Sequence, residues 1–197
     1  AAGQRGRYVM SAYQDTDLDS DVAEYALRLG DDALITGQRL CEWCSNGPTL
    51  EEDLALANTA LDYLGRARLL LIHSGTLVGK SADELAFQRP SEAFRNLLLV
   101  ELPRGDFAFT MVRQYLLDEF ELLLFTALSD SSDETLAAIS SKALKEIHYH
   151  HRRSKEWMYR LGRGSVESHQ RTQRAINEIW GYVHELFEMD DLDNRLV

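Results

Sequence analysis

The chain has 197 residues, of which 45% are hydrophobic and 27% charged, and its formal net charge is -11 at pH 7. This length suits one domain with a full-sized core. The negative charge excludes a general nucleic-acid or membrane-surface binder, because those anionic partners would be repelled. The sequence carries no signal-peptide pattern and no apolar run of bilayer length, which predicts a cytoplasmic protein.

The first helix is predicted over residues 19–44, where apolar side chains recur every three or four positions. Residues 1–18 open with AAGQRGRYV, a basic stretch unlike the rest, and are predicted to form a flexible tail. Near the end of the helix lies the sequence CEWC. Cys41 and Cys44 have the spacing of a redox pair, but the surroundings are helical and no second pair completes a zinc site. The pattern favours two reduced thiols in a helix.

Five further helical segments follow. Thr49 and Glu52 are predicted to form a capping box that begins a second helix over residues 50–78, which Gly79 ends. A helix-like piece is predicted at residues 91–103, and a third long helix is predicted to be capped by Asp106 and to reach residue 128. The fourth long helix is predicted to begin after the turn at residues 131–133 and to end at the glycine-containing break at 162–164. A fifth is predicted over residues 165–187.

Long helices joined mostly by short turns indicate antiparallel neighbours, with one longer connection in the middle. The predicted fold class is therefore all-α, a ferritin-like four-helix bundle with additional helices. Residues 19–190 are predicted to form a single domain, and the acidic end over residues 191–197 is predicted to fray.

A ferritin-like bundle raises the question of a metal site. Such bundles bind two irons through a glutamate from each of two helices and a Glu-x-x-His pair from each of the other two. None of the six histidines has a glutamate three residues before it. In the segment KEIHYHHRRS, the partner of Glu146 at that spacing is Tyr149. The second helix offers Arg66 and Arg68, which cannot deprotonate to bind a metal. The sequence predicts no metal site and no catalytic residue in this chain.

Four long blocks, in order, resemble one protein family: ALITGQRLCEW, DLALANTALDYLGRARLLL, FRNLLLVELPRGDFAFTMVRQYLLD and KALKEIHYHHRRSKEWMYRLG. They are similar to the structural (C) subunit of the ring-1,2-phenylacetyl-CoA epoxidase complex of bacterial aerobic phenylacetate breakdown. The resemblance covers residues 25–187. Members of that family usually continue beyond the point where this chain stops, so the end is interpreted as truncated.

The resemblance implies a ferritin-like fold without the iron ligands. It implies a non-catalytic partner of a related catalytic subunit, which carries the di-iron centre and epoxidises the aromatic ring of phenylacetyl-CoA. Reductase and accessory subunits are the other implied partners, no cofactor is expected in this chain, and a homodimer of the isolated chain is left open. Asp62 and Arg66 are implied to lie around one vacant ligand pair. Glu146 and Tyr149 are implied to hold the other.

A bundle core that keeps carboxylates but loses its metal must neutralise their charge in another way. Arginine and tyrosine in place of histidine supply positive charge and hydrogen bonds. The sequence therefore predicts a buried polar network in the core. Its predicted members are Arg66 or Arg68, Glu146, His150, and an acid from Asp118 and Glu119.

Two other functions stay open. A stand-alone metal-binding ferritin-like oxidase would use the His-rich segment of the fourth helix, namely Glu146, His148, His150 and His151. A CoA-binding module would hold phosphates with the basic residues of that helix, Lys142, Lys145, Arg152, Arg153 and Lys155, although a solvated helix face also explains such charges. The aromatic residues Trp43, Trp157, Tyr159 and Trp180 are candidate interface anchors or core residues.

Overall fold

The structure, a computed structural model, describes the backbone of residues 3–196 and the side chains of residues 18–196. Every regular element in that part of the chain is helical. The long helices are α1 (Gly3–Cys41), α2 (Leu50–Val78), α5 (Phe107–Leu128) and α6 (Glu134–Gly162). The shorter elements are α3 (Ala82–Phe87), η1 (Ser91–Ala93), α4 (Leu98–Glu101), α7 (Val166–Ile179), η2 (Trp180–Tyr182), η3 (His184–Phe187) and α8 (Asp191–Leu196). The fold is all-α, a ferritin-like four-helix bundle with additional helices, as predicted.

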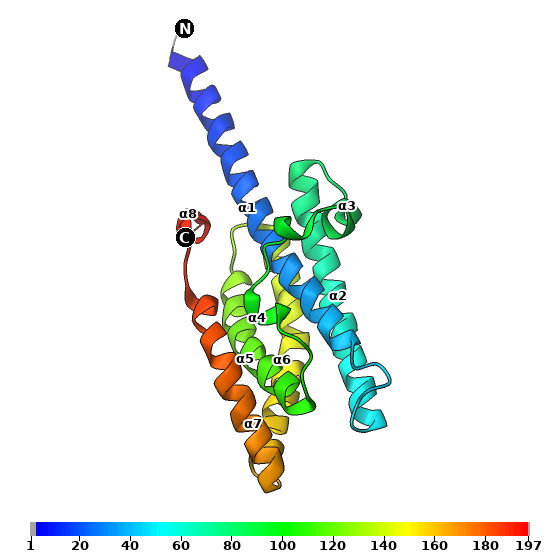
Figure 1. Cartoon of the computed structure of the whole chain (residues 1–197). Helices are drawn as coiled ribbons and strands as arrows, with labels where there is room; N and C mark the ends of the chain where they lie inside the picture. The colour runs from blue at the N-terminus through cyan, green and yellow to red at the C-terminus, as the bar shows by residue number, and fades with distance from the viewer. Residues whose placement is uncertain (1–2, 197) are drawn as a thin grey trace.

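The four long helices pack as two pairs. Helix α1 lies along α2, α5 lies along α6, and contacts between α2 and α6 join the pairs (Figure 1). Helix α7 packs on α5 and α6, and α8 returns to α1. Large apolar side chains fill the main core, among them Leu40, Leu56, Met111 and Ile179. None of the helices between residues 3 and 196 has an apolar stretch long enough to cross a bilayer.

Local capping sets the main helix boundaries. The hydroxyl of Thr49 accepts the backbone N–H of Glu52 at 3.4 Å and so begins α2. The predicted capping box is only half present, because the carboxylate of Glu52 pairs with Arg153 of α6. Gly79, in the left-handed region with φ of 69°, ends α2, and Asp106 caps α5 by accepting a backbone N–H at 2.9 Å. These last two boundaries confirm the sequence prediction.

The connection between α2 and α5 differs from the prediction of a helix-like piece at residues 91–103. Only η1 and α4 are helical there, and the backbone between them is extended. Two adjacent acids of α1 hold it in place: Asp31 accepts the N–H of Arg95 at 2.9 Å, and Asp32 accepts the N–H two residues later at 2.7 Å. Asp31 also accepts hydrogen bonds from the guanidinium of Arg89. Because these carboxylates satisfy backbone donors, the segment needs no helical partners.

The two ends of the chain also differ from the expected boundaries. Helix α1 begins at Gly3 rather than at residue 19, and its first turns project beyond the bundle (Figure 1). The helix expected over residues 165–187 ends at Ile179 and continues as the 3₁₀ turns η2 and η3. Residues 191–196, predicted to fray, form α8, in which Leu192 is buried and Arg195 pairs with Asp21 of α1 at 2.8 Å. The division into a tail, one domain and an end stays a prediction.

Candidate functional site

A cluster of buried polar side chains lies in the bundle between α2, α5 and α6. Arg66 of α2 donates from Nη2 to both carboxylate oxygens of Glu121 on α5, at 3.0 and 3.1 Å. The hydroxyl of Tyr63, one helical turn earlier on α2, donates to the same carboxylate at 3.0 Å. Arg66 is 4% exposed and Glu121 is 5% exposed. The spacing of three residues aims both α2 side chains at one acceptor.

The same cluster continues to the third helix. Gln114 of α5 donates from Nε2 to the Tyr63 hydroxyl at 2.9 Å and to Asp118 Oδ1 at 2.7 Å. Ser154 of α6 donates to Asp118 Oδ2 at 2.6 Å. These bonds run without a break from α2 through α5 to α6. Both carboxyl oxygens of Glu121 and of Asp118 thus have hydrogen-bond partners, as buried polar groups require.

Burial controls the charge of the two acids. Desolvation raises the pKa of Glu121, and the facing guanidinium of Arg66 opposes that rise. Desolvation raises the pKa of Asp118 to about 8, against the hydrogen bond from Ser154. The Arg66 guanidinium also lies 4.3 Å from the centroid of the Tyr63 ring and 4.9 Å from that of Phe125. The Arg66 cation therefore favours the ionised form of Glu121, whereas burial favours the protonated form of Asp118.

The free energy of unfolding is expected to carry a term from Asp118 that falls as the pH rises from 3.8 towards about 8. Over that window the folded chain keeps the proton, whereas the unfolded chain has lost it. Folding therefore takes up a proton, and a rise in pH disfavours it. Asp118→Asn removes this term, so the decline in stability should become shallower. Urea denaturation at several pH values measures it.

Other buried groups also contribute to the pH dependence, so Asp118→Asn should flatten the decline without abolishing it. Burial likewise raises the pKa of Asp32, to about 8, and those of Glu121 and Glu146. The lowered pKa of His150 acts in the opposite direction between about pH 4 and pH 6.5.

Glu119→Gln, on the same helix as Asp118, is the control. The pKa of Glu119 is lowered by hydrogen bonds from Tyr115 and His151, so it acts only in more acidic solution. An unchanged slope in Asp118→Asn would contradict the assignment.

A second pairing lies beside the cluster. Nε2 of His150 lies 3.0 Å from Asp62 Oδ2, and the His150 ring stacks on Tyr63 with centroids 5.6 Å apart. Burial lowers the pKa of His150 to about 4, so the imidazole is neutral at physiological pH. Asp62, Arg66 and Glu146 line a cavity of about 160 Å³ next to it. Burial, and then the nearby Asp62, raise the pKa of Glu146.

The predicted members of the network divide into three groups. Arg66, Asp118 and His150 are buried in the core. Asp62 and Glu146 are half-buried at the cavity, and Glu119 faces His151 at 2.9 Å away from the cluster. Arg68 and Tyr149 are exposed. The structure thus gathers Asp62, Arg66 and Glu146 around one space and leaves Arg68 and Tyr149 outside.

Four members of the cluster were missed as site residues: Tyr63, Gln114, Glu121 and Ser154. A signal existed for two of them. Gln114, Asp118 and Glu121 recur at spacings of four and three residues in an otherwise apolar helix, which places three polar groups on one face. Ser154 carried no such signal, because a single serine in a polar helix face is common.

The donor set does not fit a pair of irons. The side chain that meets Glu121 is a guanidinium, which offers only donors and keeps its charge. Among the side chains of residues 18–196, no three from His, Cys, Asp and Glu converge in a way that could hold a metal ion. Nδ1 of His150 is buried without a hydrogen-bond partner in that range, but one imidazole nitrogen does not make an iron site. His148 is exposed, so the His-rich segment does not converge either.

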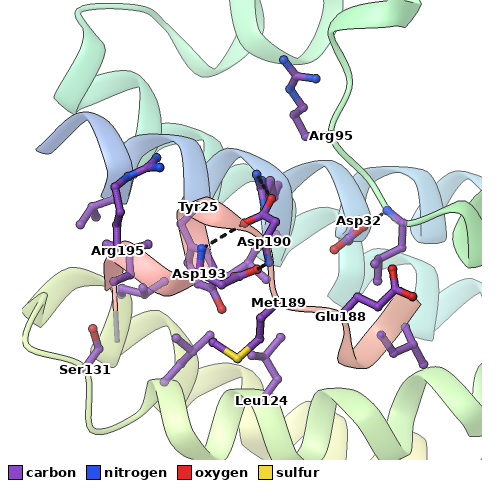
Figure 2. A pocket seen from close by; sticks show the side chains of 18 of the residues that line it. Tyr25, Asp32, Arg95, Leu124, Ser131, Glu188, Met189, Asp190, Asp193 and Arg195 are labelled. Carbon is purple, nitrogen blue, oxygen red and sulfur yellow. Dashed lines mark hydrogen bonds and ion pairs between the residues drawn. The ribbon is translucent and has the colours of Figure 1, made fainter. Parts of the chain in front are cut away.

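A second and larger space, a groove of about 1050 Å³, is lined by α1, α5 and the C-terminal segment. Figure 2 shows Tyr25 on α1, Leu124 on α5 and Met189 on the C-terminal segment around this space. Its acidic residues are Asp19, Asp32, Asp133, Glu185, Glu188, Asp190 and Asp193, and its basic residues are Arg28, Arg95 and Arg195. Because acids outnumber bases and Asp190 already engages Arg28 at 2.6 Å, the groove repels the phosphates of a nucleotide.

Comparisons with known proteins place the chain in a family. Residues 10–197 match the family described as phenylacetic acid catabolic protein. The chain is also 50% identical over 178 residues to the C subunit of 1,2-phenylacetyl-CoA epoxidase from Escherichia coli (strain K12). That alignment covers 90% of this chain and 72% of the relative. The chain therefore belongs to the phenylacetic acid catabolic protein family.

Proposed function

We propose that this chain is a non-catalytic structural subunit of a multicomponent oxygenase that epoxidises the aromatic ring of phenylacetyl-CoA. In this role it binds and stabilises a separate catalytic subunit, which holds the di-iron centre. The identity with the C subunit of an epoxidase supports the pathway and the complex. The observation that carries the non-catalytic role is the Arg66–Glu121 pair, in which a guanidinium and not a metal ion faces a buried carboxylate of the bundle core.

The chemistry of the core supports a scaffold rather than a reaction site. Arg66 and Glu121 satisfy each other's charge, and Asp118 is held by Gln114 and Ser154. These side chains are already paired with one another, and they are buried, so they have little access to solvent. Such a network favours one arrangement of three helices, which is what a partner subunit needs from a rigid surface.

The surface retains candidates for partner contact. Tyr159 and Trp180 are 55% and 56% exposed, and large aromatic side chains are frequent interface anchors. Trp43 is buried, and Trp157 packs edge-to-face on Phe107 with centroids 4.8 Å apart, so these two belong to the core. The two free thiols suit a reducing compartment such as the cytoplasm, where the complex is proposed to work.

Co-expression with a di-iron subunit candidate from the same genome tests the proposal. We expect one stable complex in size-exclusion chromatography, with iron in the partner and only traces in this chain after the subunits are separated. The physical reason is that the guanidinium of Arg66 already pairs with Glu121 and repels a metal cation from that carboxylate. Iron analysis of each separated subunit is the measurement.

The stand-alone oxidase predicts the opposite distribution of metal. Stoichiometric iron in this chain alone, together with failure to bind the partner, would reject the scaffold and return the His-rich segment to consideration. A CoA-binding role predicts retention of this chain on immobilised CoA. The acidic groove and the net charge of -11 argue against that outcome.

A further inference from the structure

The two cysteines lie in one tight turn at the end of α1. Cys41 is the last residue of the helix, and the N–H of Cys44 donates to the carbonyl oxygen of Cys41 at 3.0 Å. A bond between residues three apart is the 3₁₀ pattern, in which the two side chains lie directly above each other. The Cα atoms of such a turn are within about 7 Å. A disulfide requires a Cα separation of roughly 4.4–6.8 Å.

Trp43, one of the two residues between the cysteines, fixes the direction in which the thiols face. Trp43 is 6% exposed, and its Nε1 donates to Thr110 of α5 at 3.0 Å. Its ring meets Phe107 edge-on with centroids 5.7 Å apart. With Trp43 anchored in the core, the flanking Cys41 and Cys44 are left on the outside of the turn, and both are free and exposed. The Trp43 side of the turn is therefore fixed against α5, and the side that carries the two thiols is accessible to solvent.

We propose that Cys41 and Cys44 form a redox-active dithiol that closes to an intrachain disulfide when hydrogen peroxide is the oxidant. The thiolate of one cysteine attacks a peroxide oxygen, the O–O bond breaks, and a sulfenic acid and hydroxide form. The second thiol attacks the sulfenic sulfur, the S–S bond forms and the S–O bond breaks. Two thiols are oxidised by two electrons, and with the released protons the peroxide becomes two molecules of water.

Burial, and then the neighbouring Cys44, raise the pKa of Cys41. Fewer Cys41 side chains are therefore ionised at neutral pH than in an ordinary cysteine. The turn geometry allows either thiol to attack the peroxide and the other to close the disulfide. This inference concerns the chain alone and does not depend on the proposed function.

Thiol counting on the purified chain tests the proposal, because the sequence has only 2 cysteines. After reduction and treatment with an equimolar amount of hydrogen peroxide, we expect both thiols to disappear together and the mass to fall by two hydrogen atoms. Dithiothreitol should restore both thiols, and a non-reducing gel should show a monomer. Matched variants are Cys41→Ser and Cys44→Ser, which should show complete loss of the intrachain product. Circular dichroism confirms that both variants fold.

Two results would overturn the inference. Disulfide-linked dimers from the unmodified chain would mean that the thiols meet between chains and not within one. A gain in mass from added oxygen, which dithiothreitol does not reverse, would mean that the cysteines oxidise independently.

Discussion

Replacing Arg66 with alanine is expected to lower the free energy of unfolding by about 3–5 kcal/mol, because it leaves a buried carboxylate without its counter-charge. Glu121 is 5% exposed and would keep only the hydroxyl of Tyr63 as a donor. The loss should be larger at pH 8 than at pH 5, since protonation of Glu121 relieves the unpaired charge at lower pH. Urea denaturation at the two pH values gives both quantities.

Arg68→Ala is the matched control for this experiment. Arg68 lies two residues further along the same helix, is exposed, and should change the free energy of unfolding by no more than about 0.5 kcal/mol. The double variant Arg66→Met with Glu121→Leu should recover most of the loss, because apolar groups of similar volume replace both charges. Equal losses in Arg66→Ala and Arg68→Ala would show that the buried pair does not stabilise the bundle.

The second large effect is expected at Asp31. This side chain is fully buried and holds the guanidinium of Arg89 and the N–H of Arg95. Asp31→Ala should cost about 3–5 kcal/mol, because a partly buried guanidinium loses its partner. The extended segment at residues 94–97 should also detach from α1 before the bundle unfolds. Limited proteolysis would then cut there first, and thermal denaturation gives the loss of stability.

Asp19→Ala provides the control on the same helix. Asp19 is exposed, and its removal should leave stability within about 0.5 kcal/mol of the unmodified protein. A double-mutant cycle with Arg89→Ala separates the interaction energy of the Asp31–Arg89 pair from the losses of stability in the two single variants. If the losses at Asp31 and Arg89 simply add, the ion pair does not hold the connection and the backbone contact with Arg95 alone explains the effect.

Local sequence was sufficient for most helix boundaries. The side chains of Thr49 and Asp106 and the left-handed Gly79 act within one turn of their own position, so their effect can be read without the fold. The connection at residues 91–103 shows the limit of such local rules. Its apolar spacing indicates a helix, but Asp31 and Asp32, more than 60 residues earlier, bind its backbone and keep it extended.

The polar core shows the same division. The failure of Glu-x-x-His and the presence of Arg66 are properties of the sequence and led directly to the prediction of a bundle without an iron pair. Which acid meets Arg66 depended on the rotation of α5 against α2. That rotation selected Glu121, which contacts Arg66 at 3.0 Å, and turned Glu119 towards His151.

The amino-acid sequence was enough to establish the helical class, the order of the long helices, the resemblance to one family and the types of charge available to the core. Those features depend on spacing and composition, which are local and additive along the chain. The packing of the folded chain was needed to show that Arg68 and Tyr149 face solvent, that Tyr63 and Ser154 complete the cluster, and that Trp43 turns two thiols outward. Partners far apart in the chain are chosen by the packing of whole helix faces, where a rotation of one residue replaces one side chain by another.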